Sequence, residues 1–140
     1  MSETPSFEAA DFQQGLPPPG YYHARIAMAR FRRSERGNET IQVVYQLDGP
    51  APGHDRVSEY FLLSGASARG RALSRQRLLA LYRGCGFAPR EGDGIDPADL
   101  FGAQLEVRVA HDNWQGHPCL RVVGHRSGGP AETSSTAVPF

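Results

Sequence analysis

Apolar and polar residues alternate along five segments of the chain, a pattern typical of β-strands that bury one face. The first two segments cover residues 21–31 and 40–49, and the turn-forming run at 34–39 predicts that they pair as an antiparallel hairpin. The side chains expected inside are Tyr22, Ala24, Ile26 and Met28 in the first segment and Ile41, Val43, Tyr45 and Leu47 in the second.

A third segment, residues 56–63, places Val57, Phe61 and Leu63 inside. The same register leaves Glu59 on the inner face, where we expect it to lie near the rim of the fold. The fourth and fifth segments, residues 103–111 and 118–125, are expected to be joined by a long hairpin loop at 111–117. Leu105, Val107 and Val109 are the inward residues of the fourth.

The hydrophobic spacing becomes helical between the third and fourth strands. Ser67 is a good cap for a helix over about 68–83, and Gly84 and Gly86 can end it. Its apolar stripe is expected to contain Ala68, Ala72, Leu78, Leu79 and Tyr82. A single helical turn should follow, capped by Asp96 with Pro97 in its first position.

Three strands, a helix and two more strands occur in the order of the OB-fold, a five-stranded barrel that binds oligonucleotides or oligosaccharides. The 140 residues suffice for one domain, which we expect at 21–126. Residues 1–20, with three consecutive prolines, predict an extended N-terminal arm, and the small polar residues of 127–140 predict a disordered tail.

Charge is unevenly distributed along a chain whose formal net charge is zero. All 15 basic residues are arginine. Residues 21–90 contain twelve arginines and five acidic residues, a net charge of +7, whereas 91–140 contain three arginines and seven acidic residues, a net charge of −4. A basic middle between acidic ends favours a binder of polyanions.

Two patterns resemble a family of small bacteriophage proteins that was long catalogued as of unknown function. They are Pro-Gly-x-Tyr-x-Ala-x-Ile at Pro19 to Ile26 and Leu-x-Gly-x-x-Leu-x-Val at Leu100 to Val107, within a similarity that extends over residues 7–123. Members of that family are often described as phage single-stranded DNA-binding proteins with an OB-fold. The resemblance implies a role in replication or recombination, in the host cytoplasm, for a protein of phage or prophage origin.

Basic residues and aromatic rings alternate on the outward faces of the predicted strands and hairpins, as in proteins that bind single-stranded nucleic acid. His23, Gln42 and Val44 should share this face. Trp114 lies among turn formers with no apolar residues placed to bury it, so we expect it to stack on a base. The candidate nucleic-acid-binding residues are Arg25, Arg30, Arg32, Arg33, Tyr60, Arg108, Trp114 and Arg121. A solvated arginine surface is the alternative interpretation.

Other chemistries have weaker support in the sequence. His111, His117, Cys119 and Cys85 do not have the spacing of a familiar zinc site. No phosphate loop, nucleophile elbow or catalytic carboxylate pair is present, so we expect neither an enzyme nor a cofactor. Two isolated cysteines indicate a reducing cytoplasm, and neither a membrane span nor a signal peptide is predicted.

The terminal residue Phe140, after Pro139, resembles the Pro-Phe tip through which bacterial single-stranded DNA-binding proteins recruit replication and repair partners. The tail has only Glu132 where those tips have an acidic run, so the sequence favours an inert tail slightly over a docking tip. The sequence therefore predicts a non-catalytic single-stranded DNA-binding protein with little sequence preference. The competing hypothesis is a protein-interaction or recombination-accessory module that uses the same barrel without binding DNA. Pairing of an edge strand between subunits would make a homodimer, which the sequence leaves open.

Overall fold

The computed structural model describes residues 5, 16–51, 53–65 and 67–128. Its strands are β1 (Gly20–Arg33), β2 (Glu39–Leu47), β3 (Arg56–Leu62), β4 (Gln104–Trp114) and β5 (His117–Arg126). Helix α2 (Ala68–Gly84) and the 3-10 helix η1 (Pro97–Leu100) lie between β3 and β4. The predicted order of strands and helix is thus confirmed.

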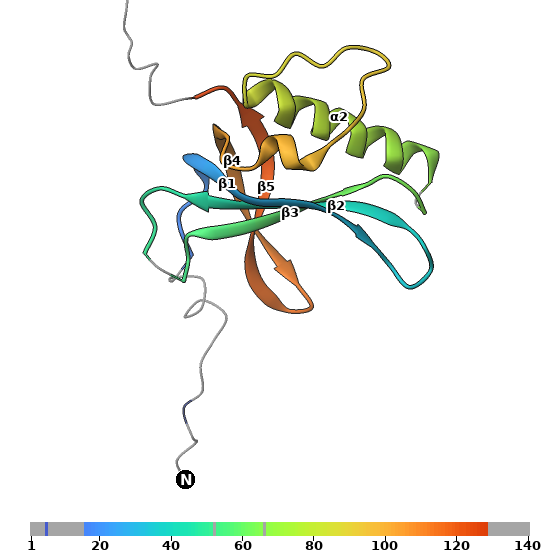
Figure 1. Cartoon of the computed structure of the whole chain (residues 1–140). Coiled ribbons are helices and arrows are strands. Elements are labelled where there is room, and N and C mark those ends of the chain that lie inside the picture. The colour runs from blue at the N-terminus through green and yellow to red at the C-terminus, as the bar shows by residue number, and fades with distance from the viewer. Residues whose placement is uncertain (1–4, 6–15, 52, 66, 129–140) are drawn as a thin grey trace, which may run out of the picture.

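The five strands form one antiparallel sheet in the order β3-β2-β1-β4-β5. Strand β1 pairs with β2 through residues 24–33 and with β4 through residues 20–25. The sheet coils so that α2 lies over one side of it, while the β1–β2 and β4–β5 hairpins project in different directions (Figure 1). Among the described residues, β3 and β5 are not paired by backbone hydrogen bonds.

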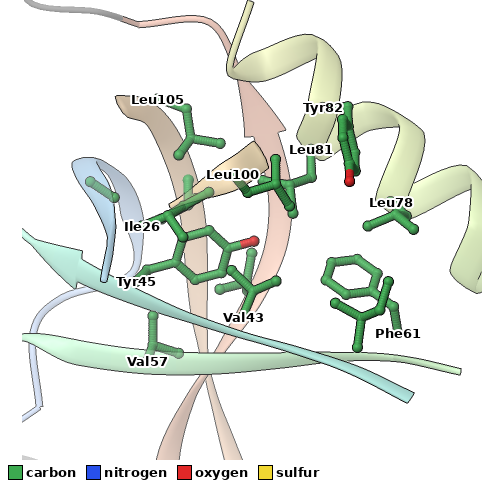
Figure 2. Close-up of a cluster of buried hydrophobic side chains, with 14 of the residues drawn as sticks. Ile26, Val43, Tyr45, Val57, Phe61, Leu78, Leu81, Tyr82, Leu100 and Leu105 are labelled. Carbon is green, nitrogen blue, oxygen red and sulfur yellow. The ribbon is translucent and has the colours of Figure 1, made fainter. Parts of the chain in front are cut away.

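The core fills the space between the inner face of the sheet and α2. Leu78 of α2 points toward Phe61 of β3, and Leu100 of η1 lies close to Leu81 (Figure 2). Every inward residue predicted for β2 and β4 is buried, namely Ile41, Val43, Tyr45, Leu47, Leu105, Val107 and Val109. The period-two pattern therefore identified the buried face of these strands correctly.

Helix α2 begins and ends close to its predicted limits. The Ser67 hydroxyl oxygen accepts a hydrogen bond from the Gly70 amide at 3.0 Å, as expected for an N-cap. The predicted apolar stripe is wrong at its N-terminal end, because Ala68 and Ala72 are exposed. Leu81, which the prediction omitted, is completely buried instead.

A β-bulge shifts the register of β1 between Ile26 and Met28. Ile26 lies opposite the buried Tyr45, but Met28 lies opposite Val44 on the outer face. The prediction that Met28 points inward is therefore wrong. A bulge adds one residue to a strand, so every later side chain moves to the other face.

The connection between β4 and β5 is tight. Strand β4 ends at Trp114 and β5 begins at His117, so only Gln115 and Gly116 lie between them. Both turn residues have positive φ, 51° and 82°, which matches the right-handed twist of the flanking strands. The predicted long loop at 111–117 is thus wrong, and Trp114 sits at the tip of a two-residue hairpin.

Glu59 points inward, as its register predicted, but it does not lie at an exposed rim. Glu59 is only 5% exposed to solvent, and three side chains contact its carboxylate. Oε1 lies 2.7 Å from both the Tyr45 hydroxyl and His125 Nε2, and Oε2 lies 2.8 Å from Arg77 Nη1. Residues from β2, β5 and α2 therefore satisfy a carboxylate of β3 where β3 and β5 face each other.

The segment before β1 contacts the sheet. His111 Nε2 lies 2.7 Å from the carbonyl oxygen of the buried Pro17, and the Tyr22 hydroxyl donates to the Pro18 carbonyl at 2.6 Å. These contacts hold residues 17–18 beside β1 and β4. Within the described part of the chain, no helix has both the length and the apolarity to cross a membrane.

Candidate functional site

One row of three side chains crosses the outer face of β1, β2 and β3. Arg30 lies opposite Gln42, which lies opposite Tyr60. The Gln42 amide nitrogen donates to the Tyr60 hydroxyl oxygen at 3.2 Å, and its carbonyl oxygen accepts from Arg32 Nη1 at 3.1 Å. Gln42 thereby fixes a tyrosine ring and a guanidinium on the same face of the sheet.

The bulge in β1 brings Arg30 and Arg32 to this face. Before the bulge, odd-numbered residues such as Arg25 point outward, opposite Gln46. After it, even-numbered residues point outward, so Arg32 lies opposite Thr40 on the same face as Tyr60. Without the extra residue, both arginines would point toward the core.

A shallow groove runs from Tyr60 toward the β1–β2 hairpin. It is lined by Arg32, Arg33, Ser34, Thr40 and Tyr60. Arg33 Nη2 lies 3.1 Å from Glu39 Oε2, and both side chains are largely exposed, so water screens this ion pair. The groove therefore places the outward-pointing guanidinium of Arg32 beside the tyrosine ring, and Arg33 also lines it.

A second groove runs from Tyr60 toward the β4–β5 hairpin. It is lined by Ser58, Tyr60, Asp112, Asn113, Trp114, Cys119, Leu120 and Arg121. Arg121 Nε lies 3.1 Å from Asp112 Oδ2, an exposed ion pair that holds the guanidinium over β4. Tyr60 thus stands between two grooves, each of which contains arginine and ends at a hairpin.

Both aromatic side chains of this surface are open to solvent. Trp114 is 65% exposed and Tyr60 is 49% exposed. Both rings line the grooves and so present aromatic faces to a ligand or partner. The exposed position expected for Trp114 is confirmed.

The structure brings together six of the eight predicted nucleic-acid-binding residues, namely Arg30, Arg32, Arg33, Tyr60, Trp114 and Arg121. Arg25 shares the outer face but lies at its far end, in the row with Gln46 and Arg56. Arg108 lies elsewhere, opposite Tyr21 and Gly124 on the part of the sheet formed by β1, β4 and β5. Phe140 lies outside the described residues.

The sequence did not reveal that Gln42 links Tyr60 to Arg32. A signal for the bulge was nevertheless present, because continuing the inward series from Tyr22 to Met28 would bury Arg30 and Arg32. Two successive inward arginines at the end of a strand are improbable without a register shift. The pairing of Gln42 with Arg30 follows only from that shift.

The remaining titratable groups do not form an additional centre in the part of the chain described. No three histidine, cysteine or acidic side chains there are grouped so that they could hold a metal ion. Burial raises the pKa of the Cys85 thiol to about 11. Desolvation, followed by the charge of Glu59, raises the pKa of Tyr45 well above its usual value, so this phenol stays protonated and donates to the carboxylate.

No protein-family model matches this chain, and no curated protein has significant sequence similarity to it.

Proposed function

We propose that this protein binds single-stranded DNA on the surface formed by Tyr60, Trp114 and the arginines between the two hairpins. The observation that carries the proposal is the position of Tyr60, whose exposed ring lies between the groove of Arg32 and Arg33 and the groove of Trp114 and Arg121. Such a surface has a ring for stacking at its centre and cations on both sides.

The chemistry of the surface favours single strands over duplexes. Arginine binds phosphate groups of any sequence, and aromatic rings stack on bases that are not already paired and stacked. In a duplex the faces of the bases are covered by their neighbours, so Tyr60 and Trp114 would have nothing to stack on. Because every base has a π-face, the binding should have little sequence preference.

The proposed architecture is an OB-type barrel in which β3 and β5 close the sheet through side chains. The contact of Glu59 with His125, together with Arg77 and Tyr45, supports this proposal. Proteins of this architecture bind oligonucleotides between the hairpin that joins strands 1 and 2 and the hairpin that joins strands 4 and 5. The two grooves beside Tyr60 lead to these hairpins.

The resemblance of the sequence to a phage family supports a role in replication or recombination in the cytoplasm of a bacterial host. In this proposal the protein catalyses no reaction and needs no cofactor. It covers exposed single strands, and the Pro139-Phe140 pair recruits a replication or recombination protein.

An electrophoretic mobility-shift assay with oligo-dT and a duplex of equal length tests the proposal. We expect the oligo-dT to be shifted at lower protein concentration than the duplex, and the shift to weaken as salt rises. Binding of neither DNA would contradict the proposal and favour a protein-interaction module on the same fold. Equal binding of both DNAs would contradict the stacking of bases on Tyr60 and Trp114.

A further inference from the structure

Helix α2 is strongly cationic. Its sequence contains Arg69, Arg71, Arg75, Arg77 and Arg83 and no acidic residue. The first turn of a helix carries the positive end of the helix dipole, where acidic side chains stabilise the helix and basic ones destabilise it. The exposed Arg69 therefore lies where it opposes helix stability, so its position favours a role in binding.

A third groove connects this end of α2 to the surface around Tyr60. Its walls are Gly70, Leu73, Ser74 and Arg77 of α2, residues 58–60 of β3 and residues 121–123 of β5. Tyr60 and Arg121 line both this groove and the groove that contains Trp114. The surface of the proposed site therefore continues between β3 and β5 to the first turns of α2.

The walls of this third groove suit a nucleotide chain. Leu73 is 50% exposed and offers an apolar surface to a base. Arg77 Nη2 donates to the Tyr60 carbonyl oxygen at 3.1 Å, while Nη1 contacts Glu59, so Arg77 fixes α2 against β3. Arg69 is exposed and directly precedes Gly70 of the groove wall in the sequence, although Arg69 itself is not a lining residue.

We propose that a single strand bound at Tyr60 continues through this groove and that Arg69 binds one of its phosphate groups. The inference rests on the proposed function and adds a second segment to its binding site. An acidic protein segment would be attracted by the same charge. The continuity of the groove with Tyr60 and Arg121 favours nucleic acid.

Charge reversal at Arg69 tests this path. Arg69→Glu is compared with Arg108→Glu, which makes the same change of charge at an exposed position outside the three grooves. The readout is the anisotropy of fluorescently labelled oligo-dT of about 5 and about 20 nucleotides, a range that spans the usual site sizes. With the longer strand, we expect Arg69→Glu to bind about 5-fold more weakly than Arg108→Glu, with a salt slope smaller by about 0.7. With the shorter strand, the two variants should bind alike.

Thermal unfolding of Arg69→Glu separates binding from folding. A glutamate in the first turn complements the helix dipole, so the variant should be at least as stable as the parent protein. Equal affinities of the two variants for the longer strand would overturn the inference and leave an acidic protein as the remaining partner for α2. The inference would also be overturned if Arg69→Glu lost the same affinity for the short and the long oligonucleotide. Arg69 would then not contact a second segment of the strand. If the unmodified protein bound neither oligonucleotide, the proposed function itself would fail.

Discussion

His125 Nε2 lies 2.7 Å from Glu59 Oε1 and so connects β5 to β3 at the two edges of the sheet. Both side chains are almost fully buried. Because Tyr45 and Arg77 contact the same carboxylate, four elements of the fold meet at one group. This cluster positions β3, and therefore Tyr60, relative to the β4–β5 hairpin.

Replacing Glu59 with alanine should destabilise the protein strongly. The change removes the acceptor for Tyr45, His125 and Arg77, and loss of one partner of a buried ionic cluster costs about 3–5 kcal/mol. Glu59→Gln keeps an acceptor oxygen and should cost less. Urea unfolding measures both, with exposed Glu35→Ala as the control expected to change stability by less than about 0.5 kcal/mol. A free energy of unfolding that is the same for Glu59→Ala and Glu35→Ala would show that the cluster does not stabilise the fold.

Cys85 should make the protein less stable in alkali. Burial raises the pKa of its thiol to about 11, whereas an unfolded chain ionises near its ordinary value of about 8.5. The contribution to stability is therefore complete below that value and is lost as the pH rises toward 11. Urea unfolding at several pH values should show a smaller loss of stability with rising pH for Cys85→Ala than for the parent protein, because only the tyrosines with raised pKa values, Tyr45 and Tyr82, then contribute. Identical pH dependence of the two proteins would contradict this assignment.

The β1–β2 hairpin should contribute phosphate contacts. Replacing Arg32 and Arg33 with alanine removes both arginines that line one groove, so the slope of log affinity against log salt should decrease by up to about 1.4, at about 0.7 per phosphate. Arg108→Ala, outside the grooves, is the control and should leave the slope close to that of the parent protein. An unchanged slope in the Arg32 and Arg33 double variant would exclude the hairpin from the binding surface.

Local patterns in the sequence predicted the elements of the fold well but did not predict the irregularities that shape the site. Alternation identified the inner faces of β2 and β4, because a buried face selects for apolar residues at every second position. The alternation pattern of one strand does not reveal the bulge after Ile26, because a bulge is defined only by how a strand pairs with its neighbour. The hairpin at Gln115 was missed because residues 111–114 have no apolar alternation, although their strand is paired with β5.

The position of Glu59 shows the same limit. The alternation in β3 predicts correctly that Glu59 points inward. It does not predict that Glu59 is buried, because the side chains that contact its carboxylate lie far away in the sequence. His125 is 66 residues later in the chain. Likewise, the sequence suggested that arginines and aromatic rings share a surface, but only the contact between β3 and β5, the two unpaired edges of the sheet, brings Trp114 and Arg121 to Tyr60.

Trp114 is the only tryptophan in the chain, so its intrinsic fluorescence reports the proposed site alone. Titration with oligo-dT should quench this fluorescence, while a duplex of the same length should quench it much less. Stacking on one ring contributes about 1–3 kcal/mol, so Trp114→Ala should weaken oligo-dT binding by roughly 5- to 150-fold with little loss of stability. Trp114→Phe should restore part of that affinity, and Tyr60→Ala should weaken binding to a similar extent. Absence of quenching, together with unchanged affinity in Trp114→Ala and Tyr60→Ala, would contradict the binding of single-stranded DNA at this surface.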